Sequence, residues 1–320
     1  MKYNVAPLEG ITGYIFRSAH HKYFPGVDKY YIPFIEPKPN SKKIFNAREY
    51  NDILPEHNKG IHVVPQILTN KAEDFIWTAG HLIDYGYKEI NLNLGCPSKT
   101  VVSKQRGSGF LAVPDRLERF LDQIFSSLDV KISIKTRLGR FSCDEFYELI
   151  RIYNKYPVSE LTIHPRTQQD FYKNLPNLSM FEKALTMTEH TVCYNGNLFT
   201  EKNLYEFSNR FPTIDRVMLG RGILANPGLI CQVKEGHPMD AKSLRAFHDE
   251  IYAGYKEVLC GDTTVLFKMK ELWCYMAFMF EDLGKFTKNI KKSSNLKAFD
   301  AAVNEMFENC PLNTDRGFIS

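Results

Sequence analysis

The chain has 320 residues, of which 43% are hydrophobic and 24% are charged, and its formal net charge is +4. This composition excludes a disordered or fibrous protein, and no stretch approaches the ~18 consecutive apolar residues of a membrane span. The length suits one large α/β domain with an appendage, or two domains.

The seven cysteines indicate a reducing compartment. None is separated from another by two residues, and their odd number argues against a disulfide framework or a zinc site. The first residues, Met1 to Asn4, lack the basic and then apolar build of a signal peptide. We therefore expect a cytoplasmic protein that holds no metal ion.

Apolar, β-branched runs alternate with helical patterns up to about residue 235. The runs predict strands near 3–6, 29–34, 62–67, 87–93, 131–136, 159–164, 190–194 and 215–219, and the patterns predict helices near 13–24, 71–85, 114–127, 142–155, 178–187 and 200–210. Eight strands alternating with helices match an α/β fold of the closed (β/α)8 TIM barrel type better than an open doubly wound sheet. The segment 36–60 shows no regular pattern and is expected to be irregular.

The pattern changes after Gly236-His237-Pro238. Beyond about residue 240 the chain shows only amphipathic helical periodicity, as at Leu244, Phe247 and Ile251. We therefore expect a C-terminal all-helical bundle domain over residues 239–320, following a barrel domain over residues 1–238.

A lysine-rich stretch lies within the helical region. Between the first and the last of these lysines there is no acidic residue, which is typical of a solvated helix face and is also compatible with phosphate contacts. The lysines are Lys285, Lys288, Lys291, Lys292 and Lys297.

Polar residues gather where the predicted strands end. Barrel enzymes keep their chemistry at the carboxyl ends of their strands, so these side chains are expected to line one polar pocket. In chain order they are Ala6-Pro7-Leu8-Glu9-Gly10, Gln66, Asn93 with Cys96, Lys135-Thr136-Arg137, His164-Pro165-Arg166, Asn195-Gly196-Asn197 and Gly220-Arg221-Gly222.

Cys96 follows the fourth predicted strand and a glycine turn, and precedes Pro97. A thiol at this place is a candidate proton donor or nucleophile. The alternative is a small buried hydrophobe in a turn, because free cysteines are among the most buried residues.

The last two clusters fit a phosphate. Glycines 196, 220 and 222 would let backbone N–H groups approach it, and Arg221 would add positive charge. Barrels commonly bind phosphate after strands seven and eight. Tight turns alone would also explain these glycines.

Gln66 and Lys135 would face a flat, hydrogen-bonding ring with a phosphate tail. A lysine charge beside an electron-rich nitrogen or carbonyl favours the anionic reduced form of a flavin. A Schiff base between Lys135 and a carbonyl substrate, as in aldolases, is the competing interpretation. The fingerprint Gly-x-Gly-x-x-Gly does not follow the first strand, which argues against a tightly held NAD domain.

Together these motifs resemble the tRNA-dihydrouridine synthases. They occur in the family's order over residues 5–229, which is nearly the whole predicted barrel. The matching segments are Ala6-Pro7-Leu8-Glu9-Gly10-Ile11-Thr12 with Phe16-Arg17, Asn93-Leu94-Gly95-Cys96-Pro97, Gly107-Ser108-Gly109, Lys135-Thr136-Arg137-Leu138-Gly139, His164-Pro165-Arg166-Thr167, Asn195-Gly196-Asn197, and Gly220-Arg221-Gly222 with Asn226-Pro227.

Four positions depart from the family's usual residues. Leu8 replaces a common methionine, and Gly13, Asn91 and Asn197 each replace a common aspartate. The change at 197 removes a carboxylate from the region expected near the cofactor. None of the four is the expected acid, Cys96.

The resemblance implies an FMN flavoenzyme that reduces the carbon-5/carbon-6 double bond of particular uridines in tRNA, with NADPH as electron source. It makes Cys96 the general acid and places Asn93, Arg137 and Arg166 beside the uracil, together with Lys135 and His164. It further implies that the helical domain binds tRNA, for which we take Lys268 and Lys270 as candidate phosphate contacts. We expect no membrane association and no obligate protein partner, and a monomer rather than a dimer, although the sequence does not decide between these two. The expected FMN contacts are Ala6, Pro7, Leu8, Gln66, Lys135, His164, Asn195, Gly196, Asn197, Gly220 and Arg221.

The main alternative is an FMN enzyme of the dihydroorotate or dihydropyrimidine type that acts on free pyrimidines. It would share the barrel, the flavin and a loop cysteine. The helical tail and the Cys96-Pro97 context favour tRNA instead. A non-enzymatic RNA-binding module would bind no flavin.

Overall fold

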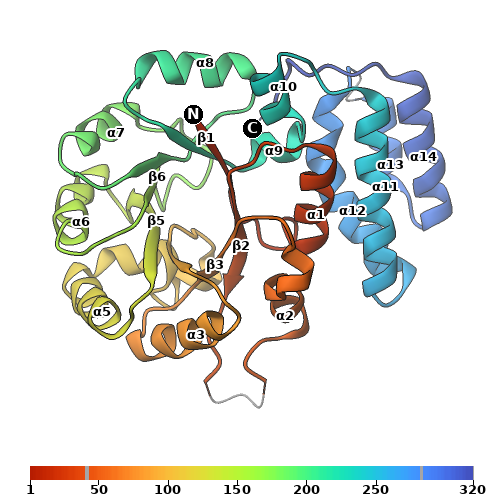
Figure 1. Ribbon diagram of the computed structural model, residues 1–320. Helices are drawn as coiled ribbons and strands as arrows, with labels where there is room; N and C mark the ends of the chain where they lie inside the picture. Colours follow the sequence, from red (N-terminus) through yellow and green to blue (C-terminus); the bar gives the residue numbers. More distant parts are fainter. Residues whose placement is uncertain (40–42, 282–283, 320) are drawn as a thin grey trace. The chain divides into compact units, whose positions relative to one another are not determined.

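The computed structural model describes residues 1–39, 43–281 and 284–319. Eight strands form a closed barrel in the order β1 to β8 (Figure 1). The predicted (β/α)8 TIM barrel is therefore confirmed, and each strand agrees with its predicted range to within three residues. The strands are β1 (Lys2–Val5), β2 (Lys29–Ile35), β3 (Val63–Ile67), β4 (Glu89–Leu94), β5 (Lys131–Gly139), β6 (Leu161–Thr167), β7 (Val192–Tyr194) and β8 (Arg216–Leu219).

The six predicted helices of the barrel region are present, and the region after residue 240 is helical as expected. Short 3₁₀ helices cover Pro55–Asn58, Gly107–Ala112, Cys143–Glu145 and Ala277–Met279. The α-helices are α1 (Tyr14–Tyr23), α2 (Ala47–Ile53), α3 (Ala72–Asp84), α4 (Lys99–Val102), α5 (Pro114–Ser127), α6 (Phe146–Tyr153), α7 (Leu178–Leu185), α8 (Glu201–Arg210), α9 (Arg221–Ala225), α10 (Leu229–Glu235), α11 (Ala241–Val258), α12 (Asp262–Met276), α13 (Lys285–Lys292) and α14 (Leu296–Asn309).

Helix α2 lies in the segment that the sequence predicts to be irregular, and that expectation is wrong. The helix begins with a capping box: Asn46 Oδ1 accepts from the Glu49 N–H at 2.9 Å, and Glu49 Oε2 accepts from the Asn46 N–H at 2.8 Å. An Asn followed three residues later by a Glu is a sequence signal for a helix start. This signal is present in the sequence, but the seven residues that follow show no extended apolar periodicity.

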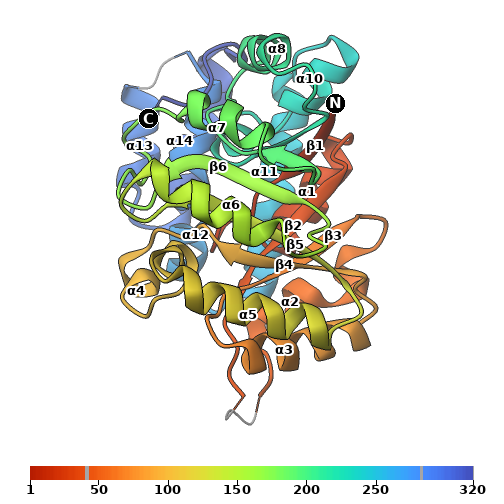
Figure 2. The same cartoon turned by 90° about the vertical axis from the view of Figure 1, so that its left-hand side faces the viewer.

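The described chain divides into two compact units. The first holds the barrel strands with α2 to α7, and α5, α6 and α7 follow one another along its outer side (Figure 2). The second holds α1 and α8 to α14. The first unit comprises Met1–Pro7, Lys29–Asn197 and Thr213–Met218, and the second Leu8–Asp28, Leu198–Pro212 and Leu219–Ser320.

Strand β4 shows how the barrel is built. Its residues alternate between apolar side chains at 90, 92 and 94, all fully buried, and the amides Asn91 and Asn93. Because successive side chains of a strand point to opposite faces, both amides lie on one face and the apolar residues on the other. Asn91 pairs in register with Ser133 of β5, and Asn93 with Lys135.

A buried charge cluster occupies the opposite end of the barrel, where the strands begin. The Glu160 side chain is 2% exposed and lies 3.4 Å from Lys29 Nζ and 3.2 Å from Arg216 Nη1. Tyr31 donates its hydroxyl to the same carboxylate at 2.7 Å, and burial raises the pKa of Tyr31 well above its usual value. Groups at this end of a barrel serve stability rather than chemistry.

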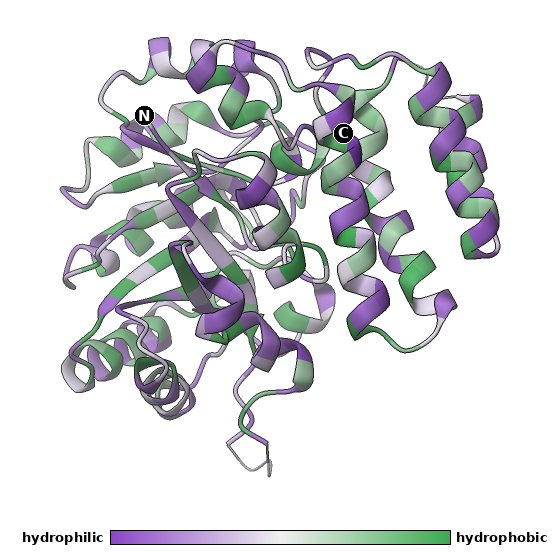
Figure 3. Ribbon diagram, turned by 45° about the vertical axis from the view of Figure 1, so that its right-hand side comes forward, coloured by the Kyte–Doolittle hydropathy of each residue, from purple (hydrophilic) through white to green (hydrophobic). Residues whose placement is uncertain are grey.

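The second unit has its own apolar core, and its helices carry hydrophobic and hydrophilic residues on the same ribbon (Figure 3). Trp273 is 1% exposed and lies in this core with Phe247, Met276 and Phe299. Position 238 lies between α10 and α11, and the proposed domain boundary there stays a prediction. In the described residues, no helix is long and apolar enough to cross a membrane.

Candidate active site at the carboxyl ends of the strands

A chain of hydrogen-bonded amides crosses strands β3, β4 and β5 in the first unit. Asn93 Nδ2 donates to Gln66 Oε1 at 2.7 Å, Gln66 Nε2 donates to Asn91 Oδ1 at 2.7 Å, and Asn91 Nδ2 donates to Ser133 Oγ at 2.9 Å. Gln66 and Asn91 are fully buried and Asn93 is 7% exposed. The direction of the chain follows from Asn93, whose Oδ1 accepts from two backbone N–H groups and whose nitrogen must therefore donate.

Those two backbone groups belong to the turn that carries the cysteine. Asn93 Oδ1 accepts from the Gly95 N–H at 3.0 Å and from the Cys96 N–H at 2.9 Å. On the other side of the turn, the Cys96 carbonyl accepts from Ser108, from its N–H at 3.1 Å and its Oγ at 2.8 Å. The backbone of Cys96 is therefore held on both sides.

The glycines of the predicted Gly107-Ser108-Gly109 motif have a steric role. A Cβ at Gly107, which also has a φ of +52°, would lie 2.8 Å from the Cys96 carbonyl oxygen. A Cβ at Gly109 would lie 2.8 Å from the Val102 carbonyl oxygen. Only glycine lets Ser108 approach Cys96 this closely.

The side chain of Cys96 is partly exposed and packs against Phe34, Leu68 and Val101. Thus it is neither fully buried as a core residue nor free in solvent. A thiol in this setting can be reached by a ligand while one side of it stays dry.

Lys135 lies opposite Asn93 on the neighbouring strand. Burial, reinforced by the charge of Arg137, lowers the pKa of Lys135 to about 8. Among the described residues its ammonium group has no carboxylate and no hydrogen-bond partner. The Lys135 side chain is of intermediate burial, so a ligand can reach it, and a partly buried cation without a counter-ion is suited to an anionic ligand.

Arg137 is a clamp between loops. It is 1% exposed, and it donates from Nε to the Gly95 carbonyl at 2.9 Å and from Nη1 to the carbonyls of Thr167 and Phe171 at 2.8 and 3.0 Å. Burial lowers its pKa. These bonds use part of the guanidinium to join the cysteine turn to the loop after β6. The expected contact of Arg137 with uracil stays a prediction.

His164 and Arg166 form a second polar chain. Arg166 Nη1 lies 2.9 Å from His164 Nε2, and Nη2 donates to Asn197 Oδ1 at 3.1 Å. Arginine is always a donor, so His164 must accept here as a neutral imidazole. Arg166 also donates from Nε to the Asn174 carbonyl at 2.6 Å. The Arg166 side chain is 1% exposed.

The remaining residues expected to contact FMN fall into both units. In the first, Asn195 donates to the Met218 carbonyl at 2.8 Å, and a Cβ at Gly196 would lie 2.0 Å from the Tyr194 hydroxyl oxygen. Ala6, at the end of β1, packs in the barrel interior. A Cβ at position 196 would therefore displace the Tyr194 side chain, which favours glycine there whether or not a phosphate binds.

Three of the expected FMN contacts and two of the candidate tRNA contacts belong to the second unit. Gly220 precedes the short helix α9, and the Arg221 guanidinium lies 5.4 Å from the Phe199 ring and 4.9 Å from the Phe318 ring. Lys268 Nζ donates to the Gly10 carbonyl and to Glu271, each at 2.9 Å, and Lys270 Nζ donates to the Ser293 carbonyl at 2.7 Å. The Leu8 side chain packs against the core of this unit.

Two residues near the candidate site were not singled out from the sequence. The Tyr172 ring lies 5.4 Å from the Arg137 guanidinium and 5.9 Å from the His164 ring, and Tyr172 is 43% exposed. The sequence presents Ser108 only as the middle residue of the Gly107-Ser108-Gly109 motif, which gives its hydroxyl no role. Tyr172 has no motif of its own, so only the fold reveals its place.

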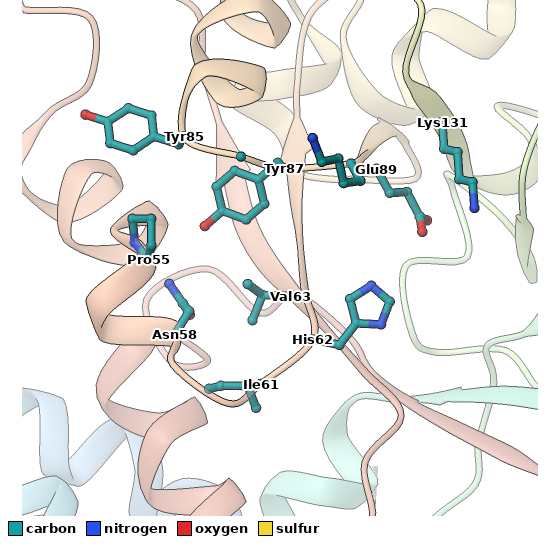
Figure 4. Close-up of a pocket in the computed structure, with 11 residues that line it drawn as sticks. Pro55, Asn58, Ile61, His62, Val63, Tyr85, Tyr87, Glu89 and Lys131 are labelled. Carbon is teal, nitrogen blue, oxygen red and sulfur yellow. The ribbon is translucent and has the colours of Figure 1, made fainter.

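A separate hollow of about 380 Å³ lies at the other end of β3, β4 and β5 (Figure 4). Its walls include His62 and Ile61 before β3, Tyr87 and Glu89 at the start of β4, and Lys131 at the start of β5. These are strand beginnings, where barrels do not place their chemistry. Among the described residues no group of three metal-ligating side chains occurs.

The sequence model of the dihydrouridine synthase family matches residues 4–315 of this chain. The chain belongs to the dihydrouridine synthase family. It is therefore a flavin-dependent oxidoreductase, and the resemblance found in the motifs is confirmed. The aldolase alternative and the non-enzymatic alternative are thereby set aside.

Curated relatives of this dihydrouridine synthase agree. The probable tRNA-dihydrouridine synthase of Staphylococcus aureus strain N315 is 30% identical over 242 residues, which cover 70% of this chain and 68% of that protein. The tRNA-dihydrouridine synthase B of Pasteurella multocida is 27% identical over 231 residues, which cover 70% of this chain and 66% of that protein.

Solved structures support the barrel fold of this family member. A variant of NCR from Zymomonas mobilis has a TM-score of 0.52 and 12% identity, and the match covers 77% of this chain and 90% of that chain. A morphinone reductase mutant in complex with tetrahydroNAD has a TM-score of 0.54 and 11% identity, with 76% and 89% covered. At these identities the likeness concerns the fold.

Proposed function

We propose that this protein reduces the carbon-5/carbon-6 double bond of particular uridines in tRNA, with FMN as its flavin and NADPH as the reductant. The observation that carries the proposal is the pairing of two features at one end of the barrel. Cys96 is held by Asn93 and Ser108, and the unpaired cation of Lys135 lies opposite Asn93 in the strand register.

The residues fit a flavin. Gln66 uses one N–H and one lone pair within the amide chain and keeps a second N–H and a second lone pair for a ring edge. Lys135 supplies a positive charge for the anionic reduced flavin. Bound FMN would supply a hydride to the pyrimidine, and the residues proposed to hold it are Ala6, Pro7, Leu8, Gln66, Lys135, His164, Asn195, Gly196, Asn197, Gly220 and Arg221.

Cys96 is proposed to give the proton that completes the reduction. A thiol with an ordinary pKa of ~8.5 is mostly protonated at neutral pH and can still donate. Asn93 positions it through the backbone N–H of residue 96, and Lys135 is proposed to stabilise negative charge on the uracil oxygens. Arg137 and Arg166 hold the loops around the pyrimidine and are proposed to line its side of the site.

The tRNA would be bound mainly through its phosphates. A stacked uridine cannot enter the end of a barrel, so it must be extruded from the helix, which costs a few kcal/mol. Lys268, Lys270 and the lysines between 285 and 297 are proposed to offset this cost, within a tRNA-binding domain spanning residues 239–320. We further propose a monomer that acts in the cytoplasm without an obligate protein partner.

The substitution Cys96→Ala tests the proposed acid. The variant should keep its flavin, seen as oxidised-flavin absorbance, and should still be reduced by NADPH, but it should lose tRNA reduction by about 100-fold or more. Unmodified tRNA transcripts, with uracil and orotate in parallel, provide the substrates. Full activity of the Ala variant would contradict the acid role, and faster reduction of free pyrimidine than of tRNA would contradict the substrate.

Salt tests the phosphate contacts. Because each neutralised phosphate releases counterions, the affinity for tRNA should fall steeply and linearly on a logarithmic plot between about 50 and 200 mM salt. Anisotropy of labelled tRNA measures this slope. An affinity independent of salt would contradict a phosphate-led interface.

A further inference from the structure

Two neighbouring loops of the first unit expose an unusual amount of apolar surface. Phe141, in the loop after β5, is 58% exposed, and in the loop after β6 Tyr172 is 43% exposed and Leu175 82%. The loops are joined, because Gln168 and Gln169 donate their N–H groups to the carbonyls of Gly139 and Arg140 at 2.9 and 3.4 Å. We call the three exposed side chains the Phe141 rim.

The backbone that presents Phe141 is held rigidly. One carboxylate, that of Glu145, accepts from three consecutive N–H groups, those of residues 140, 141 and 142, at 2.8, 2.9 and 2.9 Å. It can approach because residue 139 is glycine: a Cβ there would lie 2.8 Å from Glu145 Oε2. An exposed ring on a loop that is already ordered loses little entropy when a partner binds.

The charges around the rim favour an anionic partner. The carboxylates of Glu145 and Asp170 are turned onto groups of their own loops, Asp170 onto the Thr167 N–H at 2.7 Å and the Thr167 hydroxyl at 2.9 Å. The Arg140 guanidinium lies 4.8 Å from the Phe141 ring. Its Nε is buried, and among the described residues the guanidinium forms no hydrogen bond or ion pair, so its terminal nitrogens are unused. Apart from the exposed Asp144, the acids of these loops are therefore occupied, while Arg140 keeps donors to offer.

We propose that the Phe141 rim is an RNA-binding surface, on which an unpaired nucleobase beside the target uridine stacks against Phe141 while Arg140 contacts its phosphate. Proteins commonly hold single-stranded RNA by stacking its bases on aromatic rings while basic side chains contact its phosphates. The rim also follows the same strands, β5 and β6, that carry Lys135 and His164. When a uridine is extruded, the base next to it loses a stacking partner. The Phe141 ring can replace that partner. The inference rests on the proposed tRNA substrate.

Three substitutions of one side chain test the proposal in the flavin-loaded enzyme. Phe141→Ala should raise the Kd for an unmodified tRNA transcript, and the KM for its reduction, about ten-fold, because that is a typical loss for one stacked base. Phe141→Trp should stay within about two-fold of the wild type, and Phe141→Leu, which keeps apolar area without a π face, should resemble alanine. The rate of flavin reduction by NADPH and the thermal midpoint should not change, since Phe141 lies in neither the site nor the core.

Tyr205→Ala is the matched control, because it removes a ring that is 68% exposed on α8. Equal tRNA affinity of the wild type and Phe141→Ala would overturn the proposal, as would an equal loss in Tyr205→Ala. If Phe141→Ala instead abolished a self-association seen by sedimentation, with tRNA affinity unchanged, the rim would be a protein interface and the proposal would also be overturned. Failure of the proposed substrate itself would appear in the wild type, as a failure to bind or reduce tRNA at all.

Discussion

Lys135 is predicted to destabilise the flavin-free protein while it is charged. Burial lowers its pKa from 10.5 to about 8, and each unit of pKa difference between the folded and unfolded states corresponds to ~1.4 kcal/mol. The difference of about 2.5 units therefore costs about 3 kcal/mol of unfolding free energy at pH 7. Lys135→Met keeps the length of the side chain and removes the charge. This variant should therefore have an unfolding free energy about 3 kcal/mol higher than the wild type at pH 7.

The sign of the pH dependence is opposite to that of a lysine held by an acid. Between pH 8 and 10.5 the unfolded chain binds more protons at this lysine than the folded chain, so wild-type stability rises with pH across this window. The advantage of the Lys135→Met variant should thus fall from about 3 kcal/mol at pH 7 to below about 1 kcal/mol at pH 10. Any gain from extra apolar burial does not depend on pH and leaves this trend intact.

Urea unfolding of the flavin-free protein, followed by circular dichroism at pH 7, 8.5 and 10, measures the effect. Lys131→Met is the matched control, because it removes an exposed lysine from the start of the same strand and so shows how much of any effect comes from losing a lysine outside the site. An advantage of the Lys135→Met variant that is constant from pH 7 to 10 would refute the reasoning, as would a variant less stable than the wild type at pH 7. Reduced FMN should stabilise the wild type more than the Lys135→Met variant, because the flavin ring becomes an anion only on reduction and then provides the counter-charge that Lys135 lacks.

Two further substitutions test the framework around the site. Ser108→Ala removes the 2.8 Å hydrogen bond from the serine hydroxyl to the Cys96 carbonyl. The variant should keep its flavin content but lower kcat for tRNA about ten-fold. An unchanged kcat would mean that the backbone N–H of residue 108 is enough to hold the turn. Glu160→Gln removes the buried carboxylate that Lys29 and Arg216 share, while Lys29 keeps Glu89 and Arg216 keeps Asp215. It should reduce the unfolding free energy in urea by about 2 kcal/mol. Glu118→Gln, which breaks an exposed ion pair with Lys155, should change it by less than about 1 kcal/mol, and similar losses in both variants would argue against a special role of burial.

The barrel was predictable from the sequence because its strands are fully buried. Runs such as 90–94 can be recognised as strands before their neighbours in the sheet are known. They are short, bounded by turns, and carry an apolar residue at every second position. Helix α2 was missed because its seven residues, Ala47–Ile53, are mostly polar. The capping pair Asn46 and Glu49 was the remaining signal, and taken alone it is a weak one.

The gathering of Gln66, Asn93, Cys96 and Lys135 was also predictable, because parallel strands bring their carboxyl ends to one side. What each polar group does there was not. The sequence indicates that Arg137 is a cation near the site, but its partners are carbonyls of residues 95, 167 and 171, which only folding brings together. Likewise, Ser108 reaches the cysteine across a loop of a dozen residues.

The amide at position 91 connects these observations. With asparagine rather than aspartate, the chain from Ser133 through Asn91 and Gln66 to Asn93 is satisfied by hydrogen bonds and carries no net charge. Lys135, next along the same strand face from Ser133, consequently receives no counter-charge from that chain. A carboxylate at 91 would favour the charged lysine and weaken its need for a ligand. The neutral chain instead leaves the cation to be satisfied by whatever anion binds at the end of the barrel, and this ties the proposed affinity for reduced flavin to a residue that need not contact the flavin itself.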